Sequence, residues 1–210
     1  ASLKVKFGPS KKRLQDEKEK KMTAYHEAGH AVLAHVLPYA DPVHRISIVS
    51  RGQALGYTFI PPEKDKLQIL KSELLDDMTV MLGGRAAEML VFDEQTAGAS
   101  NDIDRVTRIA RSMVVRFGMS KLGPMNFGPQ YEGEDYSRAW GEADRPSLKV
   151  QEQVDEEMMN YVRQAETSAM SLLTKYRKKL DKIAENLLEK ETLDADEFAK
   201  LMDMPKVKAI

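Results

Sequence analysis

The chain contains the segment His26-Glu27-Ala28-Gly29-His30, which spells H-E-x-x-H. The segment lies in a stretch from Asp16 to Leu37 whose apolar residues recur at helical spacing, and Pro38 ends that stretch. Four residues are slightly more than one helical turn, so the two histidines lie about 40° apart on one face of the predicted helix. The spacing therefore predicts two imidazoles that face the same point in space.

Two imidazoles placed in this way can bind one Zn²⁺, and Glu27 lies close enough to act on a water that the metal holds. The motif lies in the apolar half of its helix, where unpaired imidazoles would be costly. Gly29 also costs about 1 kcal/mol relative to alanine inside a helix, so we expect another element to approach closely there. We interpret His26 and His30 as zinc ligands and Glu27 as the general base of a zinc-dependent peptidase.

A catalytic zinc usually has three protein ligands, and the third must come from elsewhere in the chain. The chain has no cysteine, so this ligand is a histidine or a carboxylate. His35 is expected on the opposite face of the same helix, whereas His44 on a predicted strand stays possible by geometry. The stronger candidates are Glu88 in G-G-R-A-A-E and Asp102 in A-S-N-D-I.

Length and composition are those of an ordinary globular domain. The chain has 210 residues, of which 42% are hydrophobic and 31% charged, and its formal net charge of -1 argues against a general nucleic-acid binder. No apolar run approaches the roughly 20 residues of a membrane-spanning helix, and no signal peptide is present, so this fragment is expected to be soluble. Because it starts with Ala1 rather than Met, we expect it to be processed or excised from a longer chain.

The remaining pattern predicts a predominantly α-helical (α+β) fold with a small antiparallel β element. The β element consists of a strand from Val43 to Ser50, a turn at Arg51-Gly52-Gln53 and a strand from Ala54 to Ile60. A helix is predicted from Lys66 to Phe92, in which Gly83-Gly84 marks close packing or a break. A loop from Gln95 to Asn101 follows, then a helix that ends at Gly118, and helical periodicity returns from Val150 to Leu188. This last region is one long helix or two that meet near Tyr176. Asp16 with Glu19, and Asp194 with Glu197, have the spacing of a capping box before the first helix and before a last helix from Ala195 to Met202.

Four segments resemble the FtsH family of membrane-anchored, ATP-dependent zinc metalloproteases (peptidase family M41). They are T-A-Y-H-E-A-G-H-A-V (Thr23 to Val32), A-L-G-Y-T (Ala54 to Thr58), L-G-G-R-A-A-E (Leu82 to Glu88) and G-A-S-N-D-I (Gly98 to Ile103). They match in order and in spacing, and the resemblance extends to K-E-T-L at Lys190 to Leu193. The chain is therefore identified as similar to the C-terminal peptidase domain of that family.

The resemblance implies the site residues. The third zinc ligand is then Asp102, which leaves Glu88 a structural role in which it pairs with Arg85 or with a neighbouring helix. The family usually has a second acid after this glutamate, where this chain has Met89. The substrate is expected to bind in extended form along a strand formed by Gly56, Tyr57, Thr58 and Phe59, although an ordinary hairpin strand explains this segment equally well.

The resemblance also implies the surroundings of this domain. Residues 1–15 would be the linker from an ATPase domain, and residues 16–204 the peptidase domain. Within it, 16–118 form the metal-binding helices and hairpin, 119–147 an irregular loop, and 148–204 the C-terminal helices. The partners would be polypeptide substrates, five further copies in a homo-hexamer with one Zn²⁺ per subunit, and the ATPase domain and transmembrane helices of the parent chain, with no nucleic acid. The full-length protein would be anchored in a bacterial inner membrane or an organellar membrane, with this domain on the cytoplasmic or equivalent side.

Two other functions are compatible with the residues. The first is a non-catalytic helical oligomerisation module in which H-E-x-x-H holds a structural zinc or none. The second is a zinc hydrolase that acts on small molecules, although nothing in the sequence builds a dedicated pocket for a small ligand. Cleavage of casein that a chelator abolishes would distinguish the peptidase from the oligomerisation module.

Overall fold

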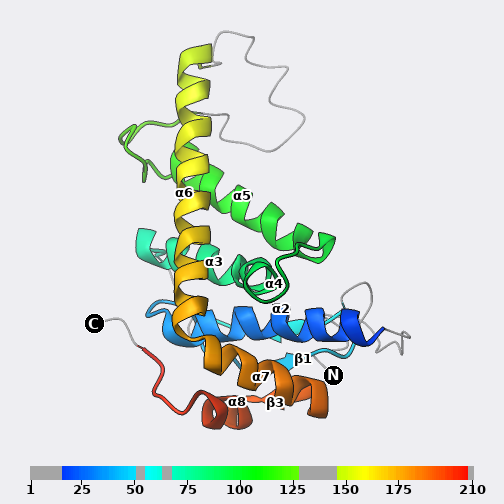
Figure 1. Ribbon diagram of the computed structural model, residues 1–210. Coiled ribbons are helices and arrows are strands. Elements are labelled where there is room, and N and C mark those ends of the chain that lie inside the picture. The colour runs from blue at the N-terminus through cyan, green and yellow to red at the C-terminus, as the bar shows by residue number, and fades with distance from the viewer. Residues whose placement is uncertain (1–15, 51–54, 63–67, 128–145, 208–210) are drawn as a thin grey trace.

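The computed structural model describes residues 16–50, 55–62, 68–127 and 146–207 (Figure 1). In chain order the elements are α2 (Glu17–Val36), β1 (Arg45–Ser47), β2 (Tyr57–Phe59), α3 (Lys71–Met81), α4 (Gly83–Phe92), the 3₁₀ turn η1 (Ala97–Ala99), α5 (Ser100–Val115), α6 (Leu148–Lys175), α7 (Arg177–Lys190), β3 (Thr192–Asp194) and α8 (Ala195–Met202). The predicted α-helical fold with a small antiparallel sheet is confirmed. The predicted linker 1–15, the turn at 51–53 and most of the loop 119–147 lie outside the described residues.

Helix α2 is the central element of the fold. It lies between α4 on one side and α7 with the sheet on the other (Figure 1). All but one of its residues from Thr23 to Val36 are buried, which agrees with the apolar second half of its sequence. The helix ends at Val36 because Leu37, directly before Pro38, is extended. Asp16 is the N-cap residue but its side chain makes no capping hydrogen bond, so the capping box predicted there is wrong.

Glycines allow α2 and α4 to cross at short range. A Cβ atom at Gly29 would lie 2.8 Å from Cβ of Ala87 and would collide with the carbonyl oxygen of Gly83. A Cβ atom at Gly83 would in turn lie 2.9 Å from the carbonyl oxygen of Gly29. The close approach predicted at both positions is confirmed, and so is the break, because Leu82 separates α3 from α4. The crossing brings the first turn of α4 against the histidine motif.

The sheet has three strands in the order β2-β1-β3, and both pairs are antiparallel. The predicted ribbon of two strands is confirmed, with Ile46 opposite Thr58, but both strands are shorter than predicted. The third strand was not predicted: Leu193 lies opposite Ile46 on the other side of β1. Strand β2 is therefore at an edge of the sheet, and β1 is its centre.

The C-terminal helices form a frame around the site. Helix α6 packs across α3, α4 and α5, and α7 turns beneath α2 (Figure 1). The two helices meet at Tyr176, which decides between the one-helix and two-helix alternatives. Helix α8 has the predicted bounds and the predicted capping box between Asp194 and Glu197. No helix within the described parts of the chain is both long enough and apolar enough to span a bilayer.

Candidate metal centre

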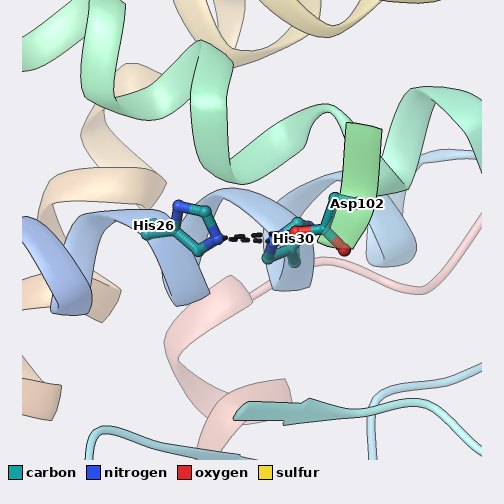
Figure 2. A group of neighbouring side chains, drawn as sticks. All are labelled: His26, His30 and Asp102. Atoms are coloured by element: carbon teal, nitrogen blue, oxygen red, sulfur yellow. Dashed lines mark hydrogen bonds and ion pairs between the residues drawn. The ribbon is translucent and has the colours of Figure 1, made fainter. Parts of the chain in front are cut away.

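Three side chains from two helices converge on one point. His26 and His30 project from neighbouring turns of α2, and Asp102 reaches them from the first turn of α5 (Figure 2). Nε2 of His26 lies 3.1 Å from Nε2 of His30, and Oδ2 of Asp102 lies 3.7 Å and 3.5 Å from these two nitrogens. Within the described ranges, these three residues form the only group of histidines and carboxylates close enough together to hold a metal ion.

The hydrogen bonds of the two Nδ1 atoms determine which atoms of His26 and His30 can bind a metal ion. Nδ1 of His26 lies 2.7 Å from Oε1 of Glu88, and Nδ1 of His30 lies 2.7 Å from the backbone carbonyl oxygen of Val80. A carboxylate and a carbonyl oxygen only accept hydrogen bonds, so each Nδ1 carries the hydrogen and donates it. In the neutral rings both Nε2 atoms then present lone pairs, beside an oxygen of Asp102. Three electron-pair donors that face one another are stabilised by a positive charge between them, which a metal ion or a proton on one ring nitrogen supplies.

The spacing of these atoms fits a zinc ion. Ligand atoms at about 2.0–2.1 Å from a tetrahedral Zn²⁺ lie about 3.3–3.4 Å apart. The observed separations of 3.1, 3.5 and 3.7 Å bracket that value. Two imidazole nitrogens and one carboxylate also form a common ligand set of catalytic zinc, which leaves a fourth position open. The residues present therefore fit the metal that the sequence motif predicts.

The electrostatics of the site also favour a positive charge at its centre. Without a metal ion, burial by itself would lower the pKa of His26, but hydrogen bonds to the carboxylates of Asp102 and Glu88 outweigh burial and raise this pKa to about 10. A proton then supplies the positive charge, and zinc must displace this proton to bind. Burial would raise the pKa of Asp102, yet hydrogen bonds from His26 and His30 hold it well below its usual range. Asp102 is thus ionised at neutral pH, as a metal ligand must be.

Glu88 holds His26 from the side away from the metal position. Its side chain is 2% exposed, and besides His26 it accepts hydrogen bonds from the backbone N–H and the hydroxyl of Thr96, at 2.8 and 3.0 Å. The expected contact with a neighbouring helix is confirmed, since His26 belongs to α2. The alternative partner Arg85 is wrong: its guanidinium donates to Gln95 at 2.6 Å. Such a carboxylate fixes the tautomer and orientation of a ligating histidine.

Glu27 lies beside the metal position and against strand β2. Its side chain is buried, with 7% of the residue exposed, and Oε2 lies 2.7 Å from the hydroxyl of Thr58. A Cβ atom at Gly56 would lie 2.8 Å from Oε1 of Glu27, so the absent side chain at Gly56 makes room for the carboxylate. The sequence offered no signal for either contact, because it does not show which face of β2 meets α2.

The predicted catalytic and metal-binding residues and three of the four predicted substrate-binding residues lie around one cleft. The cleft has a volume of about 1080 Å³ and is lined by His26, Glu27, His30 and Asp102. Four residues of the edge-strand region, Leu55, Gly56, Tyr57 and Thr58, line the same cleft, whereas Phe59 is not among the lining residues.

The two other histidines lie away from this cleft. The ring of His35 is buried and donates from Nε2 to the carbonyl oxygen of Met204 at 2.9 Å, and burial lowers its pKa. The ring of His44 packs against Phe59 in an edge-to-face contact. The packing role expected for His35 is thus observed, and neither ring belongs to the candidate metal group.

Gly84 makes room for the ring of His26, which leads to a first prediction. A Cβ atom at Gly84 would lie 2.5 Å from Nε2 and 2.6 Å from Cδ2 of that ring, which Glu88 prevents from moving freely. We expect Gly84→Ala to weaken zinc binding by about 10- to 100-fold, the range found when the support of a metal ligand is lost. Isothermal titration of the metal-free protein with Zn²⁺ measures the change.

Two controls separate this clash from unfolding. Alanine is favoured over glycine within a helix by about 1 kcal/mol, so the helical circular dichroism of Gly84→Ala should persist. The second control is a denaturant titration of the metal-free proteins, because an unchanged unfolding midpoint together with weaker zinc binding locates the effect at the site. Wild-type zinc affinity in Gly84→Ala would contradict the prediction.

Comparison with known proteins agrees with this geometry. The model of peptidase family M41 matches residues 13–201. The chain is 48% identical over 198 residues to ATP-dependent zinc metalloprotease FtsH 3 of Symbiobacterium thermophilum, which covers 93% of this chain and 32% of that protein. It is 47% identical over 198 residues to ATP-dependent zinc metalloprotease FtsH of Thermotoga maritima, with the same coverage of 93% and 32%.

A third relative covers the whole chain. ATP-dependent zinc metalloprotease FtsH 1 of Thermoanaerobacter sp. is 43% identical over 212 residues, which is 100% of this chain and 35% of that protein. The chain thus spans about a third of the length of the curated relatives that it matches. The family match over residues 13–201 and these identities show that the chain belongs to peptidase family M41.

Proposed function

We propose that this chain is the zinc metalloendopeptidase domain, residues 16–204, of an ATP-dependent, membrane-anchored protease. The observation that carries the proposal is the convergence of His26, His30 and Asp102 beside Glu27 in one cleft. The names of the relatives, all ATP-dependent zinc metalloproteases, support the same activity. One Zn²⁺ per chain would be held by Nε2 of the two histidines and by the carboxylate of Asp102.

The proposed mechanism uses few residues of the chain. When bound, zinc supplies a Lewis acid that lowers the pKa of water and polarises a carbonyl group. Glu27 accepts a proton on its carboxylate as the water attacks the scissile carbonyl, and then delivers that proton to the leaving amine. Glu88 and the carbonyl oxygen of Val80 keep His26 and His30 in the tautomer that directs Nε2 towards the cleft.

Strand β2 is proposed to bind the substrate. It is an edge of the sheet and, with Gly56, lines the same cleft as the proposed metal ligands. An extended polypeptide would add to this edge through backbone hydrogen bonds from residues 56–59. Binding through the backbone gives weak sequence selectivity, as suits a protease that acts on unfolded polypeptides.

The remaining proposed partners are other domains and other copies of the full-length protein. The chain spans about a third of its relatives, whose names state that they are ATP-dependent. We therefore propose that an ATPase domain precedes it, that residues 1–15 form the linker, and that the full-length protein is membrane-anchored. A homo-hexameric ring, with this domain on the cytoplasmic or equivalent side, follows from the family resemblance.

Removal of the metal tests the proposed function. We expect the 210-residue chain to cleave denatured casein, 1,10-phenanthroline to abolish this cleavage, and added Zn²⁺ to restore it. Zinc analysis of the same samples should give about one metal ion per chain. Bound zinc without cleavage at any protein concentration would favour the oligomerisation module, and cleavage that survives complete zinc removal would contradict the metallopeptidase.

A further inference from the structure

Thr58 makes two close contacts with Glu27 that the proposed mechanism does not use. Its hydroxyl oxygen lies 2.7 Å from Oε2 of the Glu27 carboxylate and 3.1 Å from the backbone carbonyl oxygen of the same residue. The sequence prediction counted Thr58 among the substrate-binding residues. Its side chain instead faces α2, as does the position of Gly56 two residues earlier on the same face of the strand.

The hydroxyl has one proton to donate, and the carboxylate is the better acceptor. It is closer than the carbonyl oxygen and carries a charge, so the bond to it is the stronger of the two. The carbonyl oxygen of Glu27 lies within α2, where it accepts the helical hydrogen bond from the N–H of residue 31. The carboxylate is buried and has no such helical donor, so loss of the hydroxyl would affect mainly the carboxylate.

We propose that Thr58 is a positioning residue for the catalytic base: its hydroxyl anchors Oε2 of Glu27 and so orients the carboxylate for proton transfer. The proposal rests on the proposed function, in which Glu27 is the base.

The anchor restricts a side chain that would otherwise have several rotamers. Glutamate has three rotatable side-chain bonds, and a general base must lie within hydrogen-bonding reach of its proton. With Oε2 anchored by Thr58 and Oε1 packed beside Gly56, both oxygens have defined places. Because Thr58 is paired with Ile46 of the central strand, the sheet itself supports the anchor.

This arrangement gives β2 two roles. Its backbone is the proposed binding edge for the peptide, and one of its side chains holds the base that acts on that peptide. A peptide added to β2 and the carboxylate of Glu27 would therefore be positioned by the same three-residue strand.

Thr58→Val tests the anchor with little change in shape. Valine is also β-branched, so the substitution keeps the strand and replaces the hydroxyl by a methyl group of similar size. We expect kcat for a fluorogenic peptide to fall by roughly tenfold or more, as for the loss of a hydrogen bond to a charged group. KM and zinc content should stay at wild-type values, and Thr58→Ser, which restores a hydroxyl, should recover most of kcat.

Thr174→Val provides the matched control, since this hydroxyl donates only to Met170 within α6. Crystal structures of zinc-loaded wild type and Thr58→Val provide a readout that does not depend on activity. The Glu27 carboxylate should occupy a different position in the variant. An unmoved carboxylate, an unchanged kcat in Thr58→Val, or a Thr58→Ser variant as impaired as Thr58→Val would overturn the proposal. If the zinc-loaded wild type cleaves nothing, the proposed function fails, while the two crystal structures still decide whether Thr58 holds Glu27.

Discussion

Replacement of Glu27 by glutamine is expected to lower kcat for peptide cleavage by about 100-fold or more while zinc remains bound. Glutamine has nearly the same size and keeps an oxygen that can accept the hydrogen bond from Thr58, which lies 2.7 Å from Oε2 in the wild type. It cannot take up a proton at neutral pH, and general-base catalysis contributes about 10²- to 10⁴-fold to a rate. The substitution therefore abolishes proton transfer by residue 27 and keeps the packing of its side chain.

Initial rates on a fluorogenic peptide, measured alongside zinc content, check this prediction. Glu17→Gln is the matched control, because Glu17 is exposed in the first turn of the same helix and lies outside the cleft. We expect Glu17→Gln to behave as wild type in both measurements. Full activity in Glu27→Gln would remove Glu27 as the base and leave the metal assignment standing.

The second large effect is expected at Asp102. Its carboxylate is the one group from outside α2 within the candidate metal cluster, at 3.5 and 3.7 Å from the two histidine nitrogens. Mutation of a residue that only supports a metal ligand lowers metal affinity by about 10- to 100-fold, and removal of a ligand itself lowers the affinity further. We therefore expect Asp102→Ala to lose zinc during dialysis that the wild type withstands, and to lose cleavage with it.

Asp104→Ala controls for the loss of a carboxylate from α5, since Asp104 is exposed and lies outside both the cleft and the candidate metal cluster. It should keep zinc and activity. Metal analysis of the two variants distinguishes a ligand from a general charge effect. Wild-type zinc content in Asp102→Ala would require a different third ligand. Glu88 is poorly placed for that role, because it contacts the far nitrogen of His26.

Patterns within a single helix predicted much of the secondary structure. The periodicity of α2 predicted its bounds to within one residue, because the buried half of the helix meets neighbours along its whole length. The box between Asp194 and Glu197 formed as predicted, whereas the same pattern at Asp16 and Glu19 did not.

Signals that depend on distant partners were weaker. Strand β3 has three residues, which are too few for an alternating pattern to be recognised, and it forms because it pairs with β1. Likewise, the four-residue spacing of His26 and His30 could not choose between Glu88 and Asp102. That choice came from family resemblance and then from the position of α5, which brings Asp102 to the inner nitrogens.

The sequence by itself determined that two imidazoles and a carboxylic acid share one helix, because helical geometry relates residues one turn apart without help from the rest of the chain. It also indicated where backbones must approach, since glycine inside a helix is costly unless space requires it. Only the tertiary structure decided what surrounds the motif: Glu88 behind His26, Gly84 against its ring, and Thr58 on Glu27. These contacts join elements that lie far apart in the chain, and their formation depends on how α2, α4 and the sheet pack against one another.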